Sequence, residues 1–339
     1  MPSITSHRRR AIPSTDELYD RVRQVIPPIE WATMVDDITA IWQLKAEKRA
    51  VILAHNYMTP QIFHGVADIV GDSLALARQA QDVDADVIVL AGVHFMAETA
   101  KLLNPSTTVL VPDLRAGCSL ADGITADDVA RLRQEHPGVP IVTYVNTSAA
   151  VKAASDICCT SGNAVQIVER IATRTGNDHV LLIPDQHLAR NVAAQVAPRG
   201  IGILTYAGSC EVHDRFTPAD VRQIRQDHPG VTIFAHPECP PGVVAAADLA
   251  GSTAHMQDYV EKHRPRQLAL ITECSMSDNI AAAYPDVDMI RPCNLCPHMK
   301  RNTLAAIRHV LETGANEITL DPAVADGARR AVTRMLEFS

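Results

Sequence analysis

The chain has few aromatic residues and no long hydrophobic run. No apolar stretch approaches the roughly 20 residues of a membrane-spanning helix, and no hydrophobic segment typical of a signal peptide follows the basic residues near the N-terminus. We therefore expect a cytoplasmic protein with no membrane contact. The net charge of −8 argues against nucleic acid as the main partner. Aromatic residues make up only 4% of the chain, and its many Ala, Val and Ile residues are typical of strands buried between helices.

The chain has eight cysteines, and three of them recur at equivalent places. Eight cysteines without an export signal indicate metal or redox chemistry more than a disulfide framework. Segments 125–144 and 217–236 are identical at ten of twenty positions, at an offset of 92 residues. Cys118 and Cys210 are separated by the same 92 residues, and Cys296 follows after a further 86. One thiolate per repeat can place three ligands around one metal centre at a pseudo-threefold axis.

A second set of side chains also recurs at equivalent positions in the three repeats. Each member lies at or just beyond the end of an apolar segment that is predicted to be a strand. The equivalent positions are His55, Tyr144 and His236 and, two residues further on, Tyr57, Asn146 and Glu238. Alternate residues of a strand face the same side, so both sets should point into one region.

Each repeat alternates strands with helices. The predicted strands are 50–54, 86–91 and 107–111, then 139–143, 179–183 and 201–205, then 231–235, 267–271 and 287–290. Helices are predicted over 73–81, 161–171 and 252–259, and others should begin at Thr125 and Thr217, where an Asp three residues on favours an N-terminal cap. The alternation implies an α/β protein with three homologous three-layer α/β/α domains, whose parallel sheets are related by a pseudo-threefold axis. We divide the chain into an N-terminal extension (1–45), repeats at 46–124 and 125–216, and a third repeat with C-terminal helices (217–339).

The metal depends on how many cysteines bind it. Four cysteines have no counterpart in the other repeats, and a lone cysteine is usually a small buried apolar residue. These four are Cys158, Cys159, Cys239 and Cys274. Cys293 forms a CNLC motif with Cys296 and could complete a closed zinc or iron–sulfur site, although only Cys296 keeps the phase of the repeat. With three ligands, a [4Fe-4S] cluster leaves one iron open to act as a Lewis acid, which favours chemistry over electron transfer.

The polar residues predict a small anionic substrate. Tyr57, His213, His236 and Glu238 can move protons, and Asn146 can donate hydrogen bonds to anionic oxygens. A hydroxyl recurs 16 to 18 residues after each strand-end position, at Ser73, Ser161 and Ser252 or Thr253. Taken singly, each could be an ordinary helix cap, but their recurrence in all three repeats favours three converging anion sites.

The motifs together resemble one enzyme family. The matching segments are HNYMTP, GDSLALA, YVNTSAAVKA, CTSGNA, YAGSCEVH, HPEC, AGST and CPHMKRNTL, between about Ala50 and Leu304. They resemble the bacterial quinolinate synthases. This resemblance implies a transferase of NAD biosynthesis that condenses iminoaspartate with dihydroxyacetone phosphate, and it implies three α/β/α domains around a [4Fe-4S] cluster.

The resemblance also implies roles for individual residues. Cys118, Cys210 and Cys296 would hold the cluster. The catalytic residues would be Tyr57, Tyr144, His236 and Glu238, with Glu238 and Tyr57 as the acid/base pair. Substrate contacts would come from His55, Tyr57, Ser73, Tyr144, Asn146, Ser161, His236, Glu238 and Thr253, with His213 on the phosphate side. Tyr206 departs from the family pattern, in which we expect Trp.

Two alternatives remain open at this point. One is another iron–sulfur hydro-lyase that acts on a small dicarboxylate. The other is a non-enzymatic zinc or electron-transfer protein that uses Cys293 as a fourth ligand. Because iminoaspartate hydrolyses readily, an association with L-aspartate oxidase is a further expectation.

Overall fold

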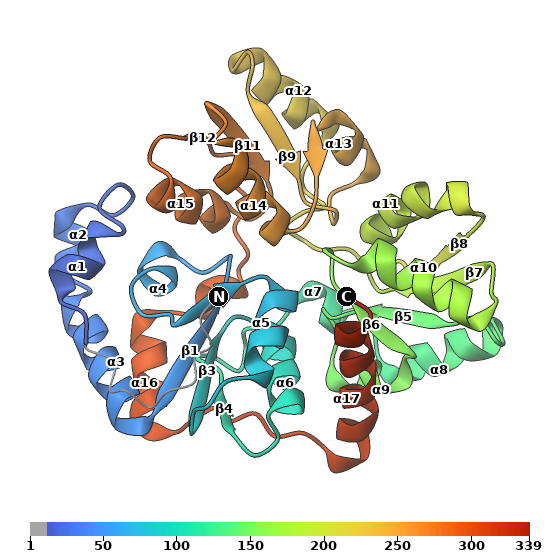
Figure 1. Cartoon of the computed structure of the whole chain (residues 1–339), viewed down its shortest axis with the longest axis horizontal. Helices are drawn as coiled ribbons and strands as arrows, with labels where there is room; N and C mark the ends of the chain where they lie inside the picture. Colours follow the sequence, from blue (N-terminus) through green and yellow to red (C-terminus); the bar gives the residue numbers. More distant parts are fainter. Residues whose placement is uncertain (1–11) are drawn as a thin grey trace.

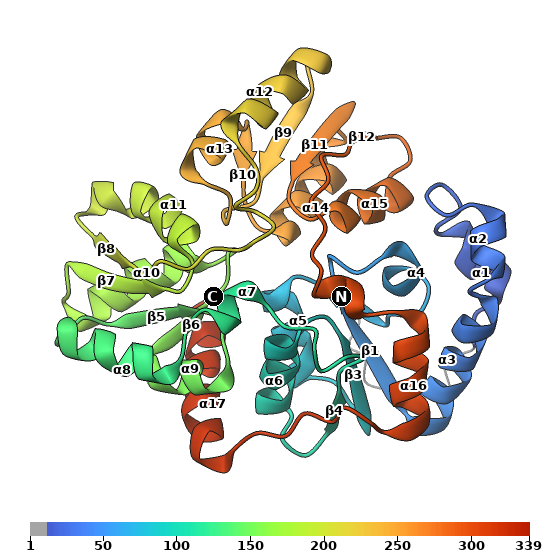
Figure 2. The same ribbon diagram turned by 180° about the vertical axis from the view of Figure 1, so that it is seen from behind.

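Three α/β units surround the centre of the molecule (Figure 1). The structure is a computed structural model that describes residues 12–339. Each unit contains a four-stranded sheet in which all the pairings are parallel. The view from behind shows the same threefold arrangement (Figure 2).

The three sheets have the same strand order. The first sheet runs β2-β1-β3-β4, the second β6-β5-β7-β8 and the third β10-β9-β11-β12. The strands are β1 (Ala50–His55), β2 (Ile69–Gly71), β3 (Val87–Ala91), β4 (Thr108–Leu110), β5 (Ile141–Tyr144), β6 (Ile157–Cys159), β7 (His179–Ile183), β8 (Gly202–Thr205), β9 (Thr232–Ala235), β10 (Leu249–Ala250), β11 (Gln267–Ile271) and β12 (Asp288–Ile290). This shared order confirms the predicted threefold α/β architecture.

Each sheet has one strand more than the sequence predicted. The additional strands β2, β6 and β10 lie at one edge of each sheet and pair with β1, β5 and β9. They are only two or three residues long, and the sequence reasoning did not find them. Neighbouring strands supply the hydrogen bonds that define them.

The helices lie between the strands in sequence. In the three repeats they are α4 (Pro60–Phe63), α5 (Ser73–Gln81), α6 (His94–Leu103), α7 (Ser119–Asp122), α8 (Ala126–Glu135), α9 (Ala149–Ala154), α10 (Ala164–Thr175), α11 (Gln186–Val196), α12 (Pro218–Asp227), α13 (Pro241–Ala246), α14 (Thr253–His263) and α15 (Cys274–Ala283), with a 3-10 turn at Ala197–Arg199. Thr125 and Thr217 cap α8 and α12 through complete capping boxes, as predicted. The middle strands are buried at nearly every position, so both faces of each sheet are covered.

The terminal helices pack mainly on the first two units. The N-terminal helices are α1 (Thr15–Asp20), α2 (Pro28–Ala32) and α3 (Val35–Lys48), and the C-terminal ones are a 3-10 turn (Met299–Arg301), α16 (Leu304–Thr313) and α17 (Pro322–Glu337). α16 packs against α3, and α17 packs against α6, α9 and β6 (Figures 1 and 2). The C-terminal helices therefore follow the third sheet in sequence but lie on the first and second units. The division at residues 45, 124 and 216 stays a proposal, and α3 runs across the first of these boundaries.

Within residues 12–339, no helix combines the length and the apolar character that a membrane span requires.

Candidate active site

One cavity collects every site residue that the sequence predicted. His55 and Tyr144 end β1 and β5, and His236 directly follows β9, so the three lie at the carboxyl ends of parallel strands, where ligands usually bind. The predicted residues that line the cavity are His55, Tyr57, Ser73, Cys118, Tyr144, Asn146, Ser161, Cys210, His213, His236, Glu238, Thr253 and Cys296. Their sequence separations span the three repeats, so only the folded chain brings them together.

The three repeated cysteines surround part of this cavity. Cys118, Cys210 and Cys296 are free, half-buried thiols in the loops that follow β4, β8 and β12. Their sulfur atoms do not all lie within 4.8 Å of one another. The donor set, three free thiols on one cavity, suits an iron–sulfur cluster, which cysteine thiolates hold.

Burial controls the charge of these thiols. Loss of solvent raises the pKa of Cys118 to about 12, and burial also raises the pKa of Cys210 and Cys296 above their ordinary values. The thiols are therefore protonated near neutral pH when no metal is bound. A metal centre must displace these protons in order to bind.

Cys293 has a different partner from those that the sequence suggested. It forms a disulfide with Cys274, at an S–S distance of 2.04 Å. An isolated parallel β-bridge pairs the backbone of Glu273 with that of Asn294. It places the start of α15 beside the loop that carries Cys293 and Cys296. The prediction that Cys274 is a lone apolar residue was wrong, and Cys293 is neither a fourth metal ligand nor a partner of Cys296 in this structure.

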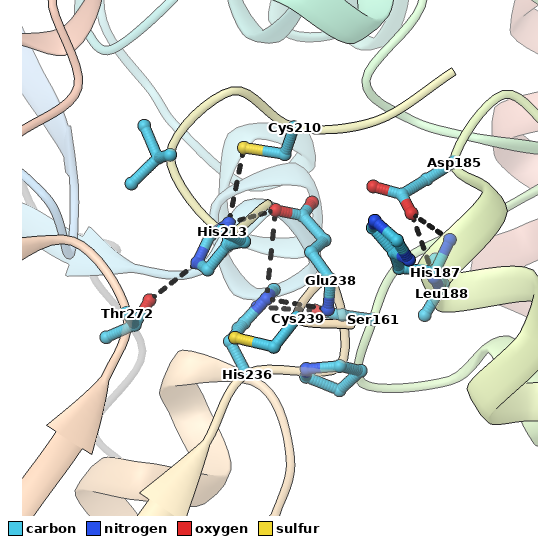
Figure 3. Close-up of polar contacts among 12 residues, drawn as sticks. Ser161, Asp185, His187, Leu188, Cys210, His213, His236, Glu238, Cys239 and Thr272 are labelled. Carbon is cyan, nitrogen blue, oxygen red and sulfur yellow. Dashed lines mark hydrogen bonds and ion pairs between the residues drawn. The ribbon is translucent and has the colours of Figure 1, made fainter. Parts of the chain in front are cut away.

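A chain of polar contacts runs along the cavity wall from Glu238 to Tyr57, and Figure 3 shows its part from Glu238 through His213 to Thr272. His213 Nδ1 lies 2.7 Å from Glu238 Oε2, and His213 Nε2 lies 2.9 Å from Thr272 Oγ1. The Tyr57 hydroxyl lies 2.5 Å from the same Thr272 oxygen. We call Glu238, His213, Thr272 and Tyr57 the proton relay, because hydrogen bonds connect a carboxylate to a phenol through an imidazole.

The electrostatics give the two ends of the proton relay different roles. Burial raises the pKa of Glu238, but the electrostatic attraction and hydrogen bond of His213, together with His236 and Tyr144, outweigh burial and hold this pKa below its ordinary value. Burial, reinforced by the charge of Glu238, raises the pKa of Tyr57 and Tyr144 well above the ordinary value. Glu238 is therefore an ionised acceptor, and the two tyrosines are protonated donors.

The sequence reasoning missed Thr272. It directly follows β11 and is almost completely buried, so the rule that ligands bind at carboxyl ends of strands could have found it. The repeat gave no signal, because Gly92 and Pro184 follow β3 and β7 at the corresponding places. His213 is bonded on both ring nitrogens within the relay, and its expected place on the phosphate side stays a prediction.

A partly buried ion pair beside the relay was also missed. Lys300 Nζ lies 2.7 Å from Glu273 Oε1 and donates to the carbonyl oxygen of Tyr57 at 3.2 Å. The Cys296 amide points to the same Glu273 oxygen at 3.5 Å. This pair connects the Cys296 loop to the start of α15 and to the loop that carries Tyr57.

The three predicted anion sites are not equivalent. Ser73 and Thr253 are the first residues of α5 and α14, directly after the N-cap residues Asp72 and Ser252. In contrast, α10 begins three residues after Ser161. The Asn163 side chain accepts hydrogen bonds from Thr160, and this turn delays the helix. Ser161 still reaches the cavity, where its hydroxyl lies 3.3 Å from His236 Nε2.

Asp72 adds a carboxylate at the cavity that the sequence reasoning did not single out. Its side chain accepts a hydrogen bond from the Ala75 amide at 2.9 Å and one from the Ser252 hydroxyl at 3.2 Å. The second bond joins the helix caps of the first and third repeats. Beside it, the Asn56 side chain donates to Thr253 Oγ1 at 2.9 Å.

Known proteins match nearly the whole chain. The family model described as "Quinolinate synthetase A protein" matches residues 39–337. The chain belongs to the quinolinate synthase family. "Quinolinate synthase 1" of Mesorhizobium japonicum is 64% identical over 325 residues, which cover 96% of this chain and 98% of that protein. "Quinolinate synthase" of Xylella fastidiosa is 67% identical over 301 residues, which cover 89% and 87% of the two chains, and that of Caulobacter vibrioides is 55% identical over 324 residues, which cover 96% and 88%.

Membership of the quinolinate synthase family confirms the resemblance seen in the sequence and makes the chain an enzyme. The departure from the family motif at Tyr206 lies outside the cavity lining. Its hydroxyl donates to the carbonyl oxygen of Gly123 at 3.1 Å, in the segment between the first two repeats. Tyr206 therefore affects the contact between these repeats rather than the substrate cavity.

Two cavity histidines of this quinolinate synthase family member should make the metal-free protein sensitive to acid. Burial lowers the pKa of His55 from its ordinary 6.5 to about 4, and that of His236 to about 3. The folded state favours the neutral rings, so their contribution to stability is complete above pH 6.5 and is lost as pH falls toward 4. Between pH 7 and pH 5, His55 alone should account for a loss of about 2 kcal/mol in unfolding free energy.

Urea unfolding of the metal-free protein at the two pH values can test this expectation. The unfolding free energy of the His55→Gln variant should fall by about 2 kcal/mol less than that of the unmodified protein between pH 7 and pH 5. An identical fall in both proteins would show that His55 does not carry this part of the acid sensitivity.

Proposed function

We propose that the protein is a transferase that condenses iminoaspartate with dihydroxyacetone phosphate to form quinolinate, phosphate and two water molecules, in the cytoplasm. The observation that carries this proposal is the convergence of three thiols, a proton relay and repeated hydroxyl groups on one cavity. The reaction balances in atoms and electrons without an external oxidant. The site must therefore support the formation of a carbon–carbon and a carbon–nitrogen bond, the loss of phosphate and two dehydrations, with the proton transfers that these steps need.

We propose that Cys118, Cys210 and Cys296 hold a [4Fe-4S] cluster. Three free thiols on one cavity, one from each repeat, support this assignment. When bound, such a cluster supplies one iron without a protein ligand, which acts as a Lewis acid on a substrate oxygen. The pairing of Cys293 with Cys274 supports a three-thiolate site, because it removes the candidate for a fourth ligand.

The proton relay would carry the acid/base steps. Glu238 is ionised and accepts a proton from the substrate carbon or nitrogen, while His213 orients the carboxylate through its 2.7 Å contact. At the other end Tyr57, held by Thr272, donates a proton to a leaving hydroxyl. Tyr144 and Asn146 also reach Glu238 and would fix its orientation.

The repeated hydroxyls would bind the anionic groups of the substrates. Ser73 and Thr253 lie at helix N-termini, where free amides and the helix dipole favour carboxylate or phosphate oxygens. Ser161 and Asn146 supply further donors from the second repeat. The neutral rings of His55 and His236 would donate hydrogen bonds without adding charge.

A substrate-omission assay tests the proposed reaction. The reconstituted protein is incubated without oxygen with oxaloacetate and ammonium, which form iminoaspartate in solution, with or without dihydroxyacetone phosphate. Quinolinate should form only in the complete mixture, and protein without iron should form none. Product formation without dihydroxyacetone phosphate would favour a hydro-lyase instead. The same assay with L-aspartate oxidase and aspartate as the imine source tests whether that enzyme can deliver the substrate.

A further inference from the structure

We infer that the metal-free protein has a second metal site, at which Cys210, His213 and Glu238 bind one Zn²⁺ or a similar divalent ion. This site goes beyond the proposed function and does not depend on it. One atom from each of the three side chains lies within 4.8 Å of the other two: the thiol sulfur, an imidazole nitrogen and a carboxylate oxygen. Figure 3 shows the three side chains pointing toward one another.

The shared atom is His213 Nδ1. It lies 3.2 Å from the Cys210 sulfur and 2.7 Å from Glu238 Oε2. Because the Glu238 carboxylate only accepts hydrogen bonds, we assign a proton to Nδ1. A metal ion in that proton's place would meet sulfur, nitrogen and oxygen ligands together, a set that Zn²⁺ prefers.

The distances require only a small adjustment. Around a tetrahedral zinc ion, sulfur and nitrogen ligands lie about 3.6 Å apart, and nitrogen and oxygen ligands about 3.4 Å apart. The Cys210 sulfur and His213 Nδ1 must therefore separate by about 0.4 Å, and His213 Nδ1 and Glu238 Oε2 by about 0.7 Å. Cys210 and His213 belong to one loop with C-x-x-H spacing, and Glu238 follows β9 in the third repeat.

The surroundings of the site favour ion binding. His213 is 1% exposed and Glu238 is 3% exposed, so water competes little for either ligand. Thr272 Oγ1 lies 2.9 Å from His213 Nε2 and can accept the proton of that nitrogen, an outer contact that orients metal-bound histidines. All three ligands line the cavity, so a fourth position is open to water or a small ligand.

The proton balance of binding is simple. The Cys210 thiol loses its proton to solvent, the imidazole proton moves from Nδ1 to Nε2, and Glu238 is already ionised. One proton therefore leaves for each ion bound. The site shares Cys210 with the proposed cluster and takes Glu238 and His213 from the proton relay, so an ion bound here should block cluster assembly.

Cobalt titration of the chelator-treated full-length protein can test the inference, because Co²⁺ replaces Zn²⁺ and its thiolate bond absorbs light. The metal-free protein should bind one Co²⁺ with a thiolate charge-transfer band, and Zn²⁺ should displace it. Cys118→Ala and Cys296→Ala should keep this band, although both lose a proposed cluster ligand. Cys210→Ala and His213→Ala should lose it, with circular dichroism reporting whether each variant is folded.

Two further measurements sharpen the test. Thr272→Val keeps all three ligands and should weaken Co²⁺ binding by about 10- to 100-fold, through loss of the outer hydrogen bond. Protein preloaded with one Zn²⁺ should take up little iron until the zinc is chelated. Loss of the cobalt band in Cys118→Ala, or its persistence in Cys210→Ala, would overturn the inference whether or not the protein makes quinolinate.

Discussion

Alanine at Cys118, Cys210 or Cys296 should abolish both the iron–sulfur centre and the formation of quinolinate. Each substitution removes one of the three thiolates that we propose as ligands, and the described residues offer no free cysteine beside them as a replacement. Iron content after anaerobic reconstitution should fall from about four atoms per chain to nearly none, and the brown absorbance should disappear with it. Iron analysis and visible spectra of the three variants measure this directly.

The disulfide-bonded cysteines provide the matched control. A variant with both Cys274→Ser and Cys293→Ser loses two sulfur atoms from the same region but none of the proposed ligands. It should keep the iron content of the unmodified protein. Full iron content and activity in Cys118→Ala would refute the three-cysteine assignment, and loss of iron from the double-serine variant would reopen the question of a fourth thiolate.

Glutamine at Glu238 should preserve the cluster but lower kcat by about 10²- to 10⁴-fold, the usual contribution of a general base. The amide nearly keeps the shape of the side chain but cannot accept a substrate proton. The substitution also removes the negative charge that lies 2.7 Å from His213 Nδ1. Steady-state kinetics and iron analysis on the same preparation separate these effects.

The control for Glu238 is the same chemical change at an exposed position. Glu135 ends α8 on the surface, outside the cavity lining, and Glu135→Gln should leave both kcat and iron content unchanged. A normal kcat in Glu238→Gln would remove this carboxylate from the mechanism. Loss of iron from Glu238→Gln would instead indicate that the side chain supports the metal centre.

Much of the fold follows from local patterns. Apolar segments of four to six residues predicted the other three strands of each sheet, β2, β6 and β10 excepted, within about two residues, because burial on both faces requires continuous apolar sequence. Thr125 and Thr217 predicted the starts of α8 and α12, since a cap and its partner lie within four residues of each other. The very short strands β2, β6 and β10, at one edge of each sheet, were missed.

The repeat explains why most of the cavity could also be predicted. His55, Tyr144 and His236 occupy equivalent positions, and threefold symmetry brings equivalent positions to one centre. Residues without counterparts gave no such signal. Thr272, Glu273 and Lys300 meet Tyr57 and Cys296 only because loops from the first and third repeats lie together in the folded chain.

The sequence alone determined the threefold α/β architecture, the equivalent positions of the three repeated cysteines and the protein family. These depend on periodicity and on motifs that are local in the chain. Tertiary structure decided which contacts the individual side chains make. It paired Cys293 with Cys274, placed His213 between Glu238 and Thr272, and delayed α10 until after Ser161. The disulfide and the relay join loops distant in sequence, and the turn before α10 depends on one asparagine side chain, so the repeat does not specify any of them.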